Sequence, residues 1–192
     1  VLMSGLILNF ANAIGTSPVC TPARATFLSG RFPTTTGVFM NDVSLSPDEK
    51  SIGKAFKAGG YDTAYIGKWH VGSEDIGMPK QHGFDWQMAT AKHGLPGSYF
   101  HPYQKKNLPS ANVPDLEDGK PGDYLTDALT DKGIGFIKDT VIKGKQPFFL
   151  ILGHYAVHTP IQAPKTLVEK YETKKKQLYG TTPLKMIPER FN

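Results

Sequence analysis

The order of the predicted elements indicates a layered αβα fold, of the α/β class, with a mostly parallel sheet. Two extended apolar segments, residues 61–67 and 148–152, alternate with segments that have helical patterns. The second is a continuous apolar run after Pro147, which is typical of a strand buried on both faces of a parallel sheet. Strands that alternate with helices predict a sheet covered by helices. The 192 residues suffice for one domain with its own core, so residues 1–192 are treated as a single domain.

The first predicted helix begins beside Cys20, the single cysteine of the chain. Thr21 is the expected N-cap, and Pro22 suits the first helical position because its missing N–H would have no partner there. Residues 23–28 continue the helix, and Gly30 is expected to end it. Cys20 would then lie at a helix N-terminus, where free N–H groups and the helix dipole favour an anion.

The middle of the chain predicts a second helix, a strand and a long loop region. Residues 46–49 read Ser-Pro-Asp-Glu, a capping box, and an apolar stripe follows over residues 52–56. Gly59 and Gly60 are expected to stop this helix before the strand at 61–67. Residues 76–122 are rich in Gly, Pro and aromatic residues without clear periodicity. This length predicts a functional loop region with short elements of its own.

The last third of the chain predicts two further helices around the second strand. Asp123 is the expected cap of a long helix that reaches about Ile142. Its inward-facing residues would be Leu125, Leu129, Phe136 and Ile137. Pro164 begins the last predicted helix, and the tail after Gly180 is expected to be loop-like. The apolar face of that helix would consist of Leu167, Val168 and Tyr171.

Charge and composition disfavour several partners. The formal net charge of +5 suits an anionic substrate, whereas the scattered lysines do not form a nucleic-acid patch. No apolar run reaches membrane-spanning length, so no membrane partner is expected. Residues 1–8 are apolar and precede Ala11-Asn12-Ala13, but they lack a basic segment and an initiator methionine. We therefore identify no signal peptide and expect the opening to be the interior of a longer chain.

Polar side chains follow both predicted strands. Ligands of parallel sheets bind outside the carboxyl ends of the strands. Lys68 and His70 follow the first strand, and on an extended segment they point to the same side. His154 and His158 follow the second strand. A lysine and a histidine on one side form an anion clamp with a proton donor, so both groups are expected to face the cleft that holds residue 20.

Three motifs resemble those of the formylglycine sulfatases. Residues 17–24 contain Cys-x-Pro-x-Arg, and Leu-Ser-Gly-Arg follows at 28–31. Residues 67–70 read Gly-Lys-Trp-His, and residues 158–160 read His-Thr-Pro. The motifs occur in the family's order, and the resemblance extends from about residue 9 to about residue 170. It implies an alkaline-phosphatase-like fold, of which this chain would be a partial catalytic domain.

The resemblance implies hydrolysis of sulfate esters through an oxidised cysteine. In this family a formylglycine-generating maturation enzyme converts the motif cysteine into an aldehyde, and its hydrated form is the nucleophile. One hydroxyl attacks sulfur and releases the alcohol, and the other expels sulfate and regenerates the aldehyde. Cys20 would be the precursor, and Arg24 would stabilise the diol. Lys68 would hold the sulfate group, and His158 would contact the sulfate or assist protonation of the leaving group. His70 would orient or deprotonate the diol, and the roles of His70 and His158 are interchangeable at this stage.

The family also implies a divalent cation, expected to be Ca²⁺ with Mg²⁺ as the alternative, for which residue 20 as formylglycine would be one ligand. Its other ligands, paired aspartates near the N-terminus and a later Asp-Asn pair, are not found here. Asp42, Asp62 and Asp75 do not occupy the corresponding positions. We therefore expect an internal fragment that alone binds Ca²⁺ poorly and turns over little. The full-length protein is expected to be periplasmic, secreted or lysosomal.

Three alternative functions stay open. The chain could belong to a phosphonate or phosphate monoester hydrolase of the same superfamily, which rates on matched aryl esters would distinguish. It could be a catalytically incomplete remnant that binds sulfated glycans through Arg24, Lys68 and the histidines. A hydrolase with a cysteine nucleophile is the third alternative, but no motif in the sequence specifically supports it. For the leading interpretation the substrate is a sulfated small molecule or glycan, with specificity expected in residues 76–122.

Overall fold

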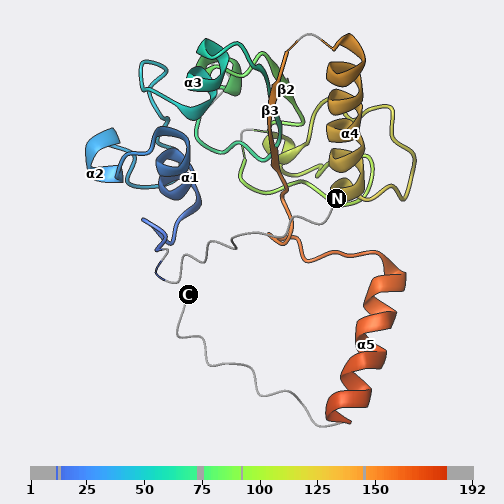
Figure 1. The fold of residues 1–192 in the computed structure, drawn as a ribbon. Coiled ribbons are helices and arrows are strands. Elements are labelled where there is room, and N and C mark those ends of the chain that lie inside the picture. The colour runs from blue at the N-terminus through green and yellow to red at the C-terminus, as the bar shows by residue number, and fades with distance from the viewer. Residues whose placement is uncertain (1–11, 13, 73–75, 92, 145, 181–192) are drawn as a thin grey trace.

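A parallel sheet forms the centre of the computed structural model, which describes residues 12, 14–72, 76–91, 93–144 and 146–180. Its strands are β1 (Asp62–Gly67), β2 (Trp86–Met88) and β3 (Phe148–Gly153), in the order β2-β1-β3. Figure 1 shows α4 along one side of the sheet and α1 and α3 on the other side. The predicted layered α/β class with a parallel sheet is therefore confirmed. The apolar run at 1–8 and the tail after Gly180 lie outside the described residues.

The sheet brings the two predicted strands into direct register. β1 pairs with β3 from Asp62 opposite Phe148 to Gly67 opposite Gly153. Both strands therefore end at the same edge, and the Lys68 N–H continues the ladder with a 2.7 Å bond to the Gly153 carbonyl. β2 was not predicted because it has only three residues and lies inside the loop region.

The first helix, α1 (Cys20–Ser29), ends at Gly30 as predicted, with Gly30 in the left-handed conformation. The predicted N-cap is wrong. Val19 occupies the N-cap position without a side-chain cap, and Thr21 lies inside the helix. The Thr21 hydroxyl donates instead to the His70 carbonyl at 2.8 Å. A long-range acceptor has therefore replaced the local one, and it fixes the start of α1 against the end of the first strand.

The second predicted helix begins later than its sequence signal. A short helix, α2 (Pro33–Thr36), comes first, and α3 follows at Ile52–Ala58. The predicted capping box at 46–49 forms a turn in which the Glu49 N–H donates to the Ser46 carbonyl at 3.0 Å. Ser51 is the actual N-cap and accepts from the Lys54 N–H at 3.3 Å. Gly59 ends the helix as predicted.

The loop region at 76–122 contains short elements, as predicted. They are β2 and two 3-10 turns, Pro79–His82 and Pro109–Ala111. The long helix that follows, α4 (Leu125–Lys143), has Tyr124 rather than Asp123 at its N-cap. The Asp123 carboxylate accepts from the Lys120 N–H at 2.7 Å instead. The last helix, α5 (Lys165–Tyr179), begins after Pro164 as predicted.

Two apolar clusters cover the two faces of the sheet. Alternate residues of β1 serve them: Ile66 belongs to the cluster beneath α4, and Tyr65 belongs to the cluster beneath α1 and α3. Leu125 and Leu129 are fully buried as predicted. β3 is only partly buried, contrary to the prediction, because it lies at the edge of the described sheet. In the described part of the chain, no helix is long and apolar enough to cross a membrane.

Candidate active site

The start of α1 and the segment after β1 meet at the sheet edge. Cys20 is the first residue of α1, partly buried and in the free thiol form. The Thr21 N–H donates to the Asn41 side-chain oxygen at 3.2 Å, and the Thr21 hydroxyl holds the His70 carbonyl. These bonds place the N-terminal end of α1, with its positive dipole end, against residues 68–70.

Arg24 fastens α1 to the end of β1. Its Nε donates to the Trp69 carbonyl at 2.7 Å. Its Nη2 donates to the Lys68 carbonyl and to the Tyr65 hydroxyl. The Tyr65 hydroxyl in turn donates to the Lys68 carbonyl at 2.6 Å. Burial raises the pKa of Tyr65, against the effect of the Arg24 charge, so this hydroxyl stays protonated and available as a donor.

Lys68 is a buried cation beside the thiol. Lys68 is only 7% exposed to solvent. Burial lowers the pKa of its ammonium group, and the nearby Arg24 charge acts in the same direction. The charge of Cys20 and a hydrogen bond to it oppose this shift of the Lys68 pKa. An anion at residue 20 and a protonated Lys68 therefore stabilise each other.

His70 is held in a conformation that few residues adopt. Its φ of 56° is left-handed, which costs a residue with a Cβ about 1–2 kcal/mol. Burial lowers the pKa of its imidazole to about 4, helped by the charges of Lys68 and Arg24 and opposed by Asp42. Its Nδ1 is buried and has no hydrogen-bond partner among the described residues. His70 is therefore neutral near pH 7 and has a ring nitrogen free to hold a proton.

His158 lies at the same sheet edge, beyond the end of β3. Its Nδ1 is 3.1 Å from the Thr159 hydroxyl, and its carbonyl accepts from the Tyr99 hydroxyl at 3.0 Å. Gln162 accepts from the Tyr99 N–H at 2.8 Å and so fixes the same loop. In the described part of the chain, no hydrogen bond joins His158 to the other four predicted site residues. The structure thus joins the segments of Cys20, Arg24, Lys68 and His70 by direct interactions, whereas the hydrogen bonds of His158 go to Tyr99, Thr159 and Tyr155.

Three residues at the site were not identified from sequence. Asn41 receives the helix N–H of Thr21, and Tyr65 supports the Arg24 guanidinium. A Cβ at Gly94 would lie 2.2 Å from Nδ1 of His70, so only glycine allows the imidazole its position. Tyr65 could have been inferred, because it precedes the strand end by two residues. Asn41 and Gly94 carry no local signal, because tertiary contacts alone bring them to the site.

A calcium site does not follow from the described residues. In these parts of the chain, no three or more His, Cys, Asp or Glu side chains converge to hold a metal ion. The Asn41 side-chain oxygen already accepts from Thr21. Because Ca²⁺ takes six to eight oxygen ligands, residue 20 with these neighbours does not satisfy it. The expectation of Cys20 as a metal ligand therefore stays a prediction.

Comparison with known proteins finds relatives of this chain among the sulfatases. The sulfatase family model matches residues 3–185. The chain is 32% identical over 169 residues to the ulvan-active sulfatase of Formosa agariphila, covering 85% of this chain and 31% of that protein. It is 30% identical over 187 residues to the N-acetylgalactosamine-6-sulfatase of Homo sapiens, covering 82% and 34%. The chain thus spans about a third of the length of these curated relatives.

Solved structures show the same likeness. The crystal structure of Ps i-CgsB in complex with k-i-k-neocarrahexaose matches with a TM-score of 0.67 and 29% identity, over 82% of this chain and 39% of that chain. The structure of BT4656 in complex with its substrate D-glucosamine-2-N,6-O-disulfate matches with a TM-score of 0.63 and 26% identity, over 85% and 30%. The predicted alkaline-phosphatase-like fold class is confirmed by these likenesses. With a family model that matches nearly its whole length, the chain belongs to the sulfatase family.

Proposed function

We propose that the protein carrying this chain hydrolyses sulfate esters, with residue 20 acting as formylglycine. The observation that carries this proposal is the position of Cys20. Cys20 is the first residue of α1, its side chain interacts with the buried Lys68 ammonium, and its neighbour Thr21 holds the His70 carbonyl. The positive end of the α1 dipole and an ammonium both favour an anion, which suits a sulfate group and an ionised diol. Cβ of Cys20 would become the carbon that bears the diol oxygens, and Sγ marks about where one of these oxygens would lie.

The surrounding residues divide the work between positioning and chemistry. Lys68 would bind the sulfate and offset the charge that develops on it. Arg24 acts first as a positioning residue, because its Nε and Nη2 are occupied by the Trp69 and Lys68 carbonyls and the Tyr65 hydroxyl. Its remaining nitrogen, Nη1, is the one left to stabilise the diol. Stabilising the nucleophile and holding the strand end would then be two roles of a single guanidinium.

The two histidines, interchangeable from sequence, take different roles in this proposal. His70 is neutral near pH 7 and lies with Cys20, so it suits the group that accepts a proton from the diol. His158 follows the end of β3, and we assign to it contact with the sulfate or the leaving group. Its loop is fixed by Tyr99 and Gln162, which gives this side chain a defined position.

A sulfated glycan is the proposed substrate class. One curated relative is named for ulvan and another for N-acetylgalactosamine-6-sulfate. Two similar structures were solved with a neocarrahexaose and with a disulfated glucosamine. The proposal also includes a formylglycine-generating maturation enzyme, a divalent cation held by further ligands, and a periplasmic, secreted or lysosomal location. Neither a nucleic acid nor a membrane partner is part of it.

The decisive experiment combines the mass of residue 20 with activity. We expect the tryptic peptide that contains residue 20 to carry formylglycine when the protein is produced in a host with the maturation enzyme. Replacing the nucleophile (Cys20→Ala) should lower hydrolysis of an aryl sulfate by at least about 10³-fold. Lys68→Met should also lower the rate of aryl sulfate hydrolysis. Lys80→Met, at an exposed lysine, is the matched control.

Three results would contradict the proposal. An unmodified cysteine at residue 20 in a competent host would contradict the aldehyde mechanism. Hydrolysis that survives Cys20→Ala would contradict residue 20 as the nucleophile. If residue 20 is modified but aryl phosphonates react faster than aryl sulfates, the site belongs to an ester hydrolase of the other class.

A further inference from the structure

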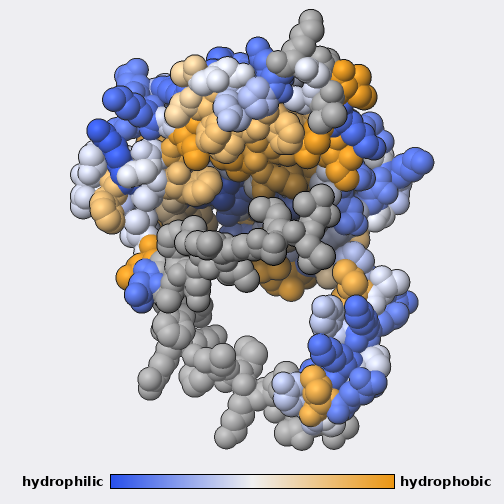
Figure 2. Space-filling model, viewed as in Figure 1, coloured by the Kyte–Doolittle hydropathy of each residue, from blue (hydrophilic) through white to orange (hydrophobic). Residues whose placement is uncertain are grey.

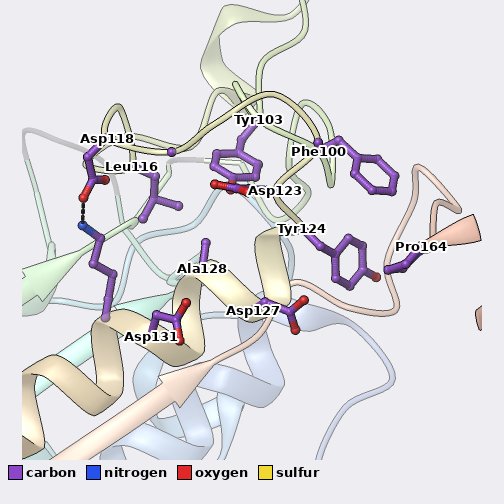
Figure 3. A pocket seen from close by; sticks show the side chains of 13 residues that line it. Phe100, Tyr103, Leu116, Asp118, Asp123, Tyr124, Asp127, Ala128, Asp131 and Pro164 are labelled. Carbon is purple, nitrogen blue, oxygen red and sulfur yellow. Dashed lines mark hydrogen bonds and ion pairs between the residues drawn. The ribbon is translucent and has the colours of Figure 1, made fainter. Parts of the chain in front are cut away.

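A cavity of about 610 Å³ opens over the first turns of α4, and none of its lining residues belongs to the group around Cys20. Figure 3 shows two walls, one formed by the loop at 100–124 and the other by the upper side of α4. The residues that carry the argument are Phe100, Tyr103, Asp123, Tyr124, Asp127 and Asp131. Neither the sulfatase motifs nor the proposed reaction uses this cavity.

Tyr103 is the first sign of a ligand. The Tyr103 side chain projects from the loop toward the cavity (Figure 3), and the residue is only 1% exposed. Its hydroxyl is buried and has no hydrogen-bond partner among the described residues. Buried polar groups in proteins are nearly always hydrogen-bonded, so an unpartnered hydroxyl beside an open cavity points to a group that fills it.

The cavity is also strongly acidic. Asp118 is neutralised by Lys132, with the two groups 2.8 Å apart. Among the described residues, the ion pairs do not include Asp123, Asp127 or Asp131, although the Asp123 carboxylate accepts from the Lys120 N–H at 2.7 Å. Asp127 lies in the first turn of α4, where a carboxylate stabilises the helix dipole. Asp131 lies one turn further along on the same wall, so the acidic lining extends beyond the first turn of the helix.

Aromatic rings complete the lining. The rings of Phe100 and Tyr124 have centroids 5.5 Å apart and both border the cavity. Proteins bind organic cations in sites lined by aromatic ring faces and carboxylates. Nearby carboxylates, after burial itself, raise the pKa of Tyr103, so its hydroxyl stays neutral and can accept a hydrogen bond.

A metal ion does not explain the cavity equally well. In the described part of the chain, no three or more acidic or histidine side chains converge as metal ligands. Carboxylates that are spread along a cavity suit a ligand whose positive groups are separated by an alkyl chain. We propose that this cavity binds a small organic diamine, with ammonium groups on Asp123, Asp127 and Asp131, the Tyr103 oxygen as a neutral acceptor, and the alkyl chain against Phe100 and Tyr124.

The test uses putrescine, a four-carbon diamine, as the probe and the 192-residue chain as the protein. Titration calorimetry should show saturable binding of putrescine, and butane-1,4-diol, which lacks the charges, should not bind. Tyr103→Phe keeps the ring and removes only the hydroxyl, so it should weaken binding about tenfold. Asp131→Asn should weaken it by a similar factor. Asp139→Asn, on the same helix but outside this cavity, is the matched control and should leave the affinity unchanged.

Each other result overturns the proposal. Absence of putrescine binding in a folded protein, checked by circular dichroism, excludes the diamine. Equal binding of the diol shows that charge is not recognised. Binding that Tyr103→Phe and Asp131→Asn leave intact, or that Asp139→Asn weakens equally, places the diamine elsewhere on an acidic surface. The proposal does not depend on sulfatase activity, so failure of one leaves the other standing.

Discussion

At the scale of single residues, Arg24 and Lys68, the two cations near Cys20, differ in the groups that they bind. The planar guanidinium of Arg24 has several donors, and it donates to two backbone carbonyls and a tyrosine hydroxyl. Lys68 has one compact charge, and its ammonium interacts with the thiol. A guanidinium fixes backbone geometry better than an ammonium can, because it donates in several fixed directions. Exchange of the two residue types would therefore lose both functions.

The site was largely predictable because its motifs are local. Cys20 and Arg24 lie one turn apart on a helix, and Lys68 and His70 lie on one segment after a strand. The strand-end rule for parallel sheets then brings the two pairs together. The division of labour was not predictable, because it depends on which carbonyls face Arg24. Asn41 and Gly94 escaped prediction for the same reason, since their contacts join segments distant in sequence.

His82 should make the stability of the fold depend on pH. The residue is fully buried, with its ring 5.5 Å from that of Trp69. Burial, followed by the charge of Lys54, lowers the pKa of His82 from 6.5 to about 4. Because the folded pKa lies below the unfolded one, protons bind preferentially to the unfolded chain. The stabilisation is thus complete above pH 6.5 and is lost as the pH falls toward 4.

The measurement is urea unfolding of the wild type and His82→Leu across this pH window. Leucine fills a similar volume and does not titrate, so the variant should lose less stability than the wild type between about pH 7 and about pH 4.5. His70, whose pKa is also lowered, accounts for a slope that stays in both proteins. Identical pH dependence in the two proteins would contradict burial of a neutral His82.

At the scale of elements, helix and strand positions were predictable but several helix starts were not. Both long strands lie where they were predicted, and glycines end α1 and α3 as predicted. The errors concern caps. Thr21, Ser46 and Asp123 each have the chemistry of an N-cap, but their side chains bond elsewhere. A cap requires a position as well as a residue type, and tertiary contacts decide which of several polar residues takes it.

Gly67 is the point where the β1 and β3 ends approach most closely. Its φ is +97°, and a Cβ there would lie 2.1 Å from the Gly153 carbonyl oxygen. Gly67→Ala should therefore destabilise the fold by at least about 2 kcal/mol, since it combines a left-handed alanine with a clash against backbone. Unfolding in urea measures this change directly.

Gly135 supplies the matched control within a helix. It lies in the interior of α4, and a Cβ there would meet nothing within 4 Å. Gly135→Ala should stabilise the fold by about 0.5–1 kcal/mol, because alanine restricts the unfolded chain and favours helix. A Gly67→Ala variant as stable as Gly135→Ala would show that the strand ends are not packed as described.

At the scale of the whole molecule, burial is concentrated around β1. The two apolar clusters lie on either side of this strand, whereas every residue of β3 is partly or fully exposed. Figure 2 shows apolar side chains gathered on the face where β3 forms the edge of the sheet. The sequence pattern predicted a fully buried strand because five consecutive apolar residues need two covered faces. Here the faces are covered only in part, since the strand has a neighbour on one side among the described residues.

In α5, too, an apolar sequence pattern is not matched by burial in the structure. Its predicted apolar face exists, but Figure 1 shows the helix projecting from the body, and none of its side chains is buried. Leu167 is 45% exposed and Tyr171 is 60% exposed. Leu167→Ala and Tyr171→Ala should each change the free energy of unfolding of the 192-residue chain by less than about 0.5 kcal/mol. Leu129→Ala, in the fully buried part of α4, should cost about 2–5 kcal/mol by comparison.

Chemical denaturation of the three variants separates two arrangements of the molecule. If the cooperative unit is the sheet with its covering helices, only Leu129→Ala shifts the unfolding midpoint. If either α5 substitution costs more than about 1 kcal/mol, the helix packs its apolar face in solution and the cooperative unit is larger than the one described. The apolar face would then contribute to folding stability in the way its sequence pattern predicts. Concentration dependence of that shift would identify a second copy of the chain as the surface against which α5 packs.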